Sequence, residues 1–173
     1  MFKLRFPEAE LTDWAGHYPS ADEVFVVEVL APRARSRGNL TKNEFLALCR
    51  WKTPRSQRFC RRNSESLIRE TTRVALATNN EELKIGVLRM LAGVEWPTAS
   101  VILHLCDRAR YPILDFRALW TLGFRRPPAY TFDFWRKYTR FIRDLARRNA
   151  CSMRQVDRAL WQYSKDNQPR GAR

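Results

Sequence analysis

Apolar residues recur along most of the chain at the spacing of helices that bury one face. Runs that alternate between apolar and polar at every second position, as strands do, are nearly absent. Two segments show the helical pattern most clearly, with stripes at Leu67, Ile68, Val74 and Ala75, and at Leu83, Val87, Leu88 and Leu91. The pattern therefore predicts an all-α fold, a compact helical bundle.

Helix start signals divide this pattern into separate elements. Four sites fit a capping box, in which two side chains satisfy the open N–H groups of a helix's first turn: Ser20 with Glu23, Thr41 with Glu44, Thr78 with Glu81, and Ser152 with Gln155. The predicted helices span about residues 21–31, 42–51, 64–77, 80–91, 97–106, 115–123, 131–149 and 153–163. We expect residues 1–19 to be irregular and 32–40 to form a basic loop. We expect one domain over 1–163 and a basic polar C-terminal tail over 164–173.

Composition adds a strong charge bias. The 173 residues include 32 Lys and Arg against 18 Asp and Glu, which gives a net charge of +14. An apolar fraction of 45% supplies a core and excludes a wholly disordered chain. The charge excess favours a nucleic-acid partner, with a solvated surface or an acidic protein partner as alternatives.

The longest apolar runs, at 24–27 and 101–103, are far too short to span a bilayer, and the first residues lack the apolar stretch of a signal peptide. The four cysteines, Cys49, Cys60, Cys106 and Cys151, form no C-x-x-C pair and indicate reduced thiols without a metal site. We therefore expect a cytoplasmic, nucleoid-associated monomer that needs no membrane and no metal.

The segment 87–104 predicts two helices joined by a tight turn. The first helix ends towards Gly93, and Pro97 suits the first turn of the second helix because its missing N–H costs nothing there. Such a hairpin leaves backbone N–H groups at the start of the second helix, where a phosphate can bind. Downstream, Asp115 follows apolar Ile113 and Leu114 at the start of another helix, where it either caps that helix or supplies a sheltered carboxylate.

These residues resemble the helix-hairpin-helix DNA glycosylase superfamily, which includes endonuclease III and the adenine DNA glycosylases. Leu91-Ala92-Gly93-Val94-Glu95-Trp96-Pro97-Thr98-Ala99 is similar to that family's hairpin, which reads Leu-x-Gly-Val-Gly-x-x-Thr-Ala. Tyr111-Pro112-Ile113-Leu114-Asp115 resembles the Phe-Pro-Ile-Leu-Asp of the adenine glycosylases, at the family's distance from the hairpin. The resemblance covers about residues 80–120 and implies a central helix-hairpin-helix DNA-binding unit.

The resemblance implies roles for single residues. Gly93, Val94, Glu95, Trp96 and Thr98 would bind a DNA phosphate through the hairpin backbone, with a monovalent cation on the hairpin carbonyls as the only cofactor. Asp115 would be the catalytic carboxylate, which stabilises the positive charge on the sugar or activates the attacking water.

Four departures from the family shape this expectation. Pro97 occupies the position where bifunctional members carry a nucleophilic lysine. Strand nicking through that residue is therefore excluded, and we expect a monofunctional enzyme that only hydrolyses the glycosidic bond. Glu95 replaces the hairpin's second glycine, where a carboxylate facing a phosphate would repel it. The four-cysteine iron–sulfur loop is absent, and Glu44 lies too close to the hairpin in sequence to match the family's general acid.

Basic residues also gather outside the hairpin. Arg50, Lys52, Arg55, Arg58, Arg61 and Arg62 form one stretch, which we expect to contact DNA phosphates. Trp51 and Phe59 within it, and Trp96 in the hairpin, either contact bases or pack in the core. Six further cations at 136–148 are expected to form a solvated flank, and His104 and Tyr111 to pack in the core.

The sequence thus predicts a protein that binds double-stranded DNA and acts as a monofunctional glycosylase, hydrolysing the N-glycosidic bond of a flipped damaged or modified base. The alternative is a non-catalytic helix-hairpin-helix DNA-binding protein that has lost this activity. An RNA-binding or purely protein-interaction role is the third.

Overall fold

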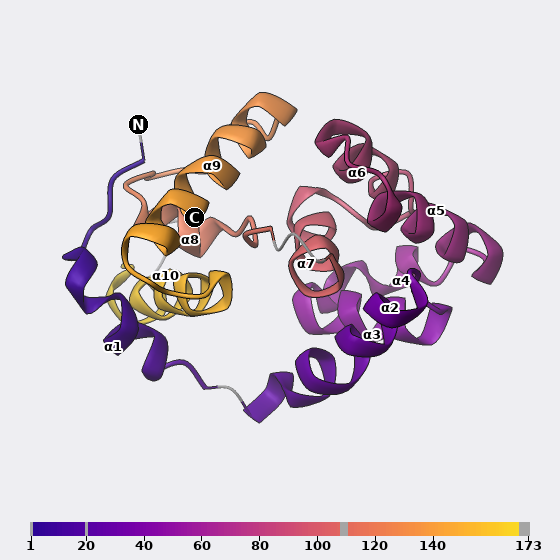
Figure 1. Ribbon diagram of the computed structural model, residues 1–173, viewed down its shortest axis with the longest axis horizontal. Coiled ribbons are helices and arrows are strands. Elements are labelled where there is room, and N and C mark those ends of the chain that lie inside the picture. Colours follow the sequence, from indigo (N-terminus) through magenta and orange to yellow (C-terminus); the bar gives the residue numbers. More distant parts are fainter. Residues whose placement is uncertain (1, 20, 108–110, 170–173) are drawn as a thin grey trace. The chain divides into compact units, whose positions relative to one another are not determined.

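The computed structural model describes residues 2–19, 21–107 and 111–169, and all regular secondary structure within these residues is helical (Figure 1). The all-α prediction is confirmed. Contacts divide the chain into two compact units, one formed by Met1–Pro19 with Pro112–Arg173 and the other by Ser20–Tyr111. Among the described residues no helix is long and apolar enough to cross a membrane.

The unit formed by Ser20–Tyr111 is built around one buried helix. It contains a 3₁₀ turn at Ala21–Glu23, a π-helix at Phe25–Leu30, α2 (Ala31–Arg37), α3 (Lys42–Lys52), a 3₁₀ turn at Pro54–Ser56, α4 (Gln57–Cys60), α5 (Glu65–Ala77), α6 (Glu81–Leu88) and α7 (Trp96–Cys106). Every residue of α7 except Pro97 is buried, and α2, α3 and α6 pack against it. The apolar run at 101–103 therefore supplies the core of this unit.

The other unit joins the start of the chain to its end. It contains a 3₁₀ turn at Glu8–Glu10, α1 (Leu11–Gly16), α8 (Phe116–Thr121), α9 (Phe132–Arg148) and α10 (Met153–Asn167), with α10 packed on the other three helices. The backbone N–H of Arg5 donates to Thr121 O at 3.0 Å. The Glu8 carboxylate accepts hydrogen bonds from Arg148, at 2.6 and 2.8 Å, and these lower its pKa. These bonds fix the N-terminal segment to the C-terminal helices.

Two of the predicted capping boxes form and one does not. Thr41 with Glu44 and Ser152 with Gln155 make both reciprocal bonds at the starts of α3 and α10. The Thr78 prediction is wrong, because Thr78 ends α5 and Asn80 caps α6 through its side-chain oxygen. The Ser20 prediction lies outside the described residues.

Three boundaries differ from the sequence expectation. The predicted basic loop 32–40 is helical as far as Arg37, because Pro32 fits a first turn and Gly38 ends the helix at φ +78°. Residues 8–16, expected to be irregular, form a 3₁₀ turn and α1. Finally, α10 continues through four residues of the predicted tail, to Asn167, and the polar segment begins after it.

The predicted apolar stripes are only half correct. Ile68, Ala75 and Leu88 are fully buried, as expected. Leu67, Val74 and Leu83 are 42, 41 and 48% exposed, because one edge of the apolar stripe on α5 and on α6 faces solvent.

Candidate nucleic-acid interface and carboxylate site

The turn between α6 and α7 is the segment that resembles a hairpin. The last turn of α6 tightens, with Met90 N–H bonding Val87 O at 3.1 Å and Leu91 N–H bonding Leu88 O at 3.2 Å. Gly93 then takes a φ of +81°, in the left-handed region that favours glycine. The helix thus ends at Leu88, earlier than the predicted 91, and the predicted glycine occupies the sharp part of the turn.

This turn packs directly on α4. A Cβ atom placed on Gly93 would lie 2.8 Å from Cys60 Sγ and 3.0 Å from Phe59 Cβ, so only glycine fits. Asn63 fastens the same turn, accepting from Ala92 N–H at 2.9 Å and donating to Ala92 O at 3.0 Å. Residues 89–95, which we call the hairpin turn, and α4 are therefore adjacent in this unit. Local sequence signals give neither Asn63 nor Cys60 a role in this turn, because both act through contacts with residues about 30 positions away.

Glu95 is the N-cap residue of α7 and gives it no side-chain cap. Its φ is −105°, an extended conformation open to any residue, so the backbone here does not need the glycine of the family pattern. Its side chain is 77% exposed, with Oε2 3.6 Å from Arg89 Nη2. The same guanidinium stacks over the Trp96 ring at 4.4 Å. The carboxylate thus turns towards a neighbouring cation.

The other predicted hairpin residues are buried. Val94, Trp96 and Thr98 are 2, 7 and 3% exposed, so their side chains belong to the core. The packing alternative for Trp96 therefore holds, and an exposed wedge does not. The exposed residues of this segment are Arg89, Met90, Ala92 and Glu95, and Gly93 and Pro97 are half-buried.

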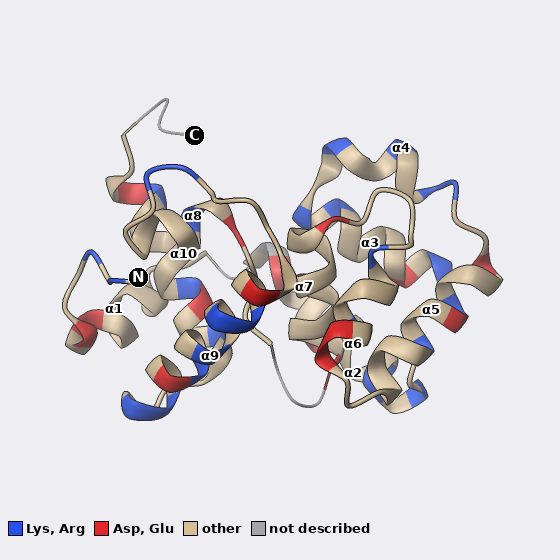
Figure 2. Ribbon diagram, turned by 90° about the horizontal axis from the view of Figure 1, so that it is seen from above, with Lys and Arg blue, Asp and Glu red and all other residues tan. Residues whose placement is uncertain are grey.

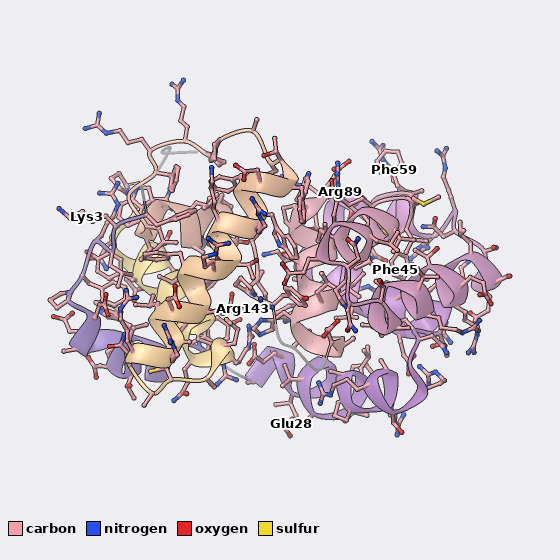
Figure 3. The ribbon with its side chains drawn as sticks, turned by 45° about the horizontal axis from the view of Figure 1, so that its top comes forward. Lys3, Glu28, Phe45, Phe59, Arg89 and Arg143 are labelled. Carbon is pink, nitrogen blue, oxygen red and sulfur yellow. The ribbon has the colours of Figure 1, made fainter. Side chains whose placement is uncertain are left out.

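Beside the hairpin lies the arginine segment, residues 50–62, which runs from the end of α3 through α4. It carries six cations and no carboxylate, and Figure 2 shows Lys and Arg along the stretch that leads into and out of α4. Phe59 is 38% exposed, with the guanidiniums of Arg58 and Arg62 at 4.6 and 5.7 Å from its ring centroid. Figure 3 shows Phe59 and Arg89 projecting from this unit. Trp51 and Lys52 are half-buried.

The charge of the arginines in this segment is not balanced by carboxylates of the described residues, unlike that of seven arginines elsewhere. Within the part of the chain that the structure describes, no carboxylate pairs with the exposed Arg50, Arg55, Arg58, Arg61 and Arg62. By contrast, carboxylates neutralise Arg37, Arg69, Arg73, Arg136, Arg147, Arg148 and Arg154. The arginine segment therefore concentrates uncompensated positive charge next to the hairpin turn.

Asp115 belongs to the other unit, where it caps α8. Its Oδ1 accepts the Arg117 N–H at 2.8 Å, so the capping role left open by the sequence is shown. The carboxyl group is half-buried and follows the buried side chains of Ile113 and Leu114. A half-sheltered carboxylate beside an apolar segment can also act on a developing positive charge.

Two tyrosines support the Asp115 segment, and the sequence analysis assigned neither to a site. The buried Tyr138 hydroxyl donates to Ile113 O at 2.8 Å, which fixes the backbone leading into Asp115. Burial, with a smaller contribution from the negative charge of Asp115, raises the pKa of Tyr130 to about 12. Tyr130 therefore stays protonated at neutral pH and within the electrostatic reach of the carboxylate.

The remaining candidate residues, His104, Tyr111 and Glu44, stabilise the fold. His104 is fully buried, with Nδ1 2.6 Å from Tyr111 O, and Tyr111 is buried too, so both expectations of core packing are confirmed. Glu44 accepts the Thr41 N–H at 2.8 Å and pairs with Arg37, so its carboxylate serves the start of α3. Among the described residues no three side chains of His, Cys, Asp or Glu gather to hold a metal ion.

No protein-family model matches the chain, and neither the curated proteins nor the solved structures include one that matches it.

Proposed function

We propose that the protein binds double-stranded DNA through the arginine segment and the adjoining hairpin turn. The observation that carries this proposal is the set of five exposed arginines without carboxylate partners on a surface that adjoins the turn. Guanidinium groups that are not neutralised within the protein release counterions when they bind phosphates, and this release drives binding. The exposed Arg89 and the half-buried Gly93 of the adjoining turn extend this surface.

We further propose that the bound DNA is a substrate, with Asp115 as the reacting carboxylate. The reaction is hydrolysis of an N-glycosidic bond: the bond from the sugar to the base breaks, the hydroxyl of water adds to the sugar carbon, and the base leaves with a proton taken from solvent, which receives the proton released by the water. Asp115 either stabilises the positive charge that develops on the sugar or accepts a proton from the attacking water. Pro97 offers no amine for a covalent intermediate.

A specific observation favours the second candidate, a non-catalytic DNA-binding protein. Asp115 Oδ1 already accepts the Arg117 N–H, and a capping aspartate needs no further role to be retained. In this reading the arginine segment and the hairpin bind duplex DNA, and Asp115 only stabilises α8.

A strand-cleavage assay with alkali work-up separates the two functions. The full chain is incubated with duplexes that each contain one damaged or modified base, alongside an unmodified duplex of the same sequence. Alkali-labile sites at one or more modified positions are the expected result, since base release leaves an abasic sugar. Binding to every duplex without any labile site would instead establish the non-catalytic function, and absence of duplex binding would overturn both.

A further inference from the structure

A hollow of about 500 Å³ lies within the unit formed by Ser20–Tyr111, where the ends of α2, α5 and α7 come together. Its volume is in the range of small-molecule sites. None of its described lining residues belongs to the arginine segment or to the hairpin turn. It is therefore a separate feature of this unit, and binding of a ligand there does not depend on the proposed function.

The lining of this hollow is rich in cations. Arg35, Arg37, Arg73 and Lys84 contribute to it, with Asp107 as the one acidic side chain among the described lining residues. Lys84 and Asp107 are both buried and pair at 2.5 Å, so the Asp107 charge is already neutralised. Glu44 pairs with Arg37, and Glu70 pairs with Arg73.

Donor groups remain unused after these pairings. The Lys84 ammonium has three N–H donors, of which one bonds Asp107 and another bonds Ala75 O at 2.8 Å. Arg73 uses only Nη1, which donates to both Glu70 oxygens at 2.7 and 2.8 Å, so its Nε and Nη2 hydrogens have no acceptor among the described residues. The Arg73 guanidinium and the Lys84 ammonium both line the hollow, and both are donors that phosphate oxygens favour.

The rest of the lining indicates an organic group beside the phosphate. Leu76, Ala77, Cys106 and Tyr111 give the hollow an apolar wall, and Asn79 adds an amide at its edge. A volume of about 500 Å³ is much larger than a phosphate ion needs. We propose that this hollow binds a nucleoside phosphate monoester, with the phosphate on Arg73 and Lys84 and the ring against the apolar wall. The ligand is either a free mononucleotide or the 5′-phosphate end of a DNA strand.

Titration calorimetry on the full chain tests this site, with dAMP as the probe and deoxyadenosine as the uncharged comparison. We expect dAMP to bind at least about tenfold more tightly than deoxyadenosine, because the phosphate makes the charge-assisted bonds. Arg73→Gln should weaken dAMP binding about tenfold. Arg69→Gln is the matched control, since Arg69 also lies on α5 and also pairs with a glutamate but does not line the hollow. It should leave dAMP binding within about twofold.

Three results would overturn the inference: no dAMP binding by the folded protein at millimolar concentration, equal losses in Arg69→Gln and Arg73→Gln, or loss of dAMP binding when Arg58, Arg61 and Arg62 are changed to glutamine. The last result would place the nucleotide on the arginine segment. Single-stranded oligonucleotides with and without a 5′-phosphate then separate the two sources. If the 5′-phosphate raises the affinity for the oligonucleotide and Arg73→Gln removes that increase, the ligand is a strand end. If the 5′-phosphate does not change the affinity although dAMP binds, the ligand is a free mononucleotide.

Discussion

Asp115 combines a structural role with the proposed chemical one, and a single substitution separates them. Asparagine caps a helix about as well as aspartate but carries no charge. Asp115→Asn should therefore keep the bond to Arg117 N–H and the melting temperature, leave duplex affinity within a few-fold, and abolish base release in the alkali assay. Asp115→Ala, as the control, should lose the cap and about 1 kcal/mol of stability as well. Undiminished base release by Asp115→Asn would show that the carboxylate serves α8 alone.

Glu95 is the one acidic side chain in the hairpin sequence 91–99, and it lies 3.6 Å from Arg89. Its carboxylate both reduces the positive charge of Arg89 and repels an approaching phosphate. Glu95→Gln should tighten binding to an unmodified duplex about fivefold, since a like charge near a phosphate costs on the order of 1 kcal/mol at a protein surface. The backbone should not change, because its φ of −105° suits any residue. Weaker binding by a folded Glu95→Gln protein would mean that the carboxylate itself contributes to the site.

At the scale of elements, the turn between α6 and α7 contains a glycine that the fold requires, and α6 contains one that it does not. Gly93→Ala should destabilise the protein by about 2 kcal/mol, because φ is +81° and the new methyl group would meet Cys60 Sγ at 2.8 Å. Gly86→Ala, in open space within α6, should stabilise it by about 0.5–1 kcal/mol. Urea denaturation followed by helical circular dichroism measures both. Equal effects of the two changes would contradict the described packing of the turn on α4.

Local signals predicted the elements well wherever one side chain decides the outcome. The caps at Thr41 and Ser152 and the turn at Gly93 follow from bonds or dihedral angles within a few residues of sequence. The helix at 31–37 was missed because Pro32 and Gly38 suggest a loop when they are read together, although each is compatible with one end of a helix.

Contacts between distant elements were beyond the reach of the sequence. Leu67 and Val74 share the periodicity of Ile68 and Ala75, and only the packing of α5 decides which of them is exposed. The hydrogen bonds between Asn63 and Ala92 join residues 29 positions apart, and the hydrogen bond from Tyr138 to Ile113 O joins residues 25 positions apart. For the same reason the sequence identified Asp115 as a candidate but not the tyrosines that surround it.

For the molecule as a whole, net charge alone does not select a binding surface. Residues 1–19 and 112–173 carry sixteen Lys and Arg against eight Asp and Glu, and residues 20–111 carry sixteen against ten. Both units are thus strongly basic. The arginine segment concentrates six cations and no acidic residue within 13 residues, whereas α9 spaces acidic residues three or four positions from Arg136, Lys137 and Arg147.

The salt dependence of duplex binding tests the central claim most directly. For the full chain and an unmodified duplex, the logarithm of affinity should fall with the logarithm of salt concentration with a slope of about −4, as expected for about five phosphate contacts. Changing Arg58, Arg61 and Arg62 to glutamine should make that slope shallower by about 2.5 and weaken binding. Changing Arg69, Arg136 and Arg147 instead removes the same charge from paired arginines and should leave the slope within about 0.5. A wild-type slope near zero, or equal slopes for the two triple variants, would contradict the account.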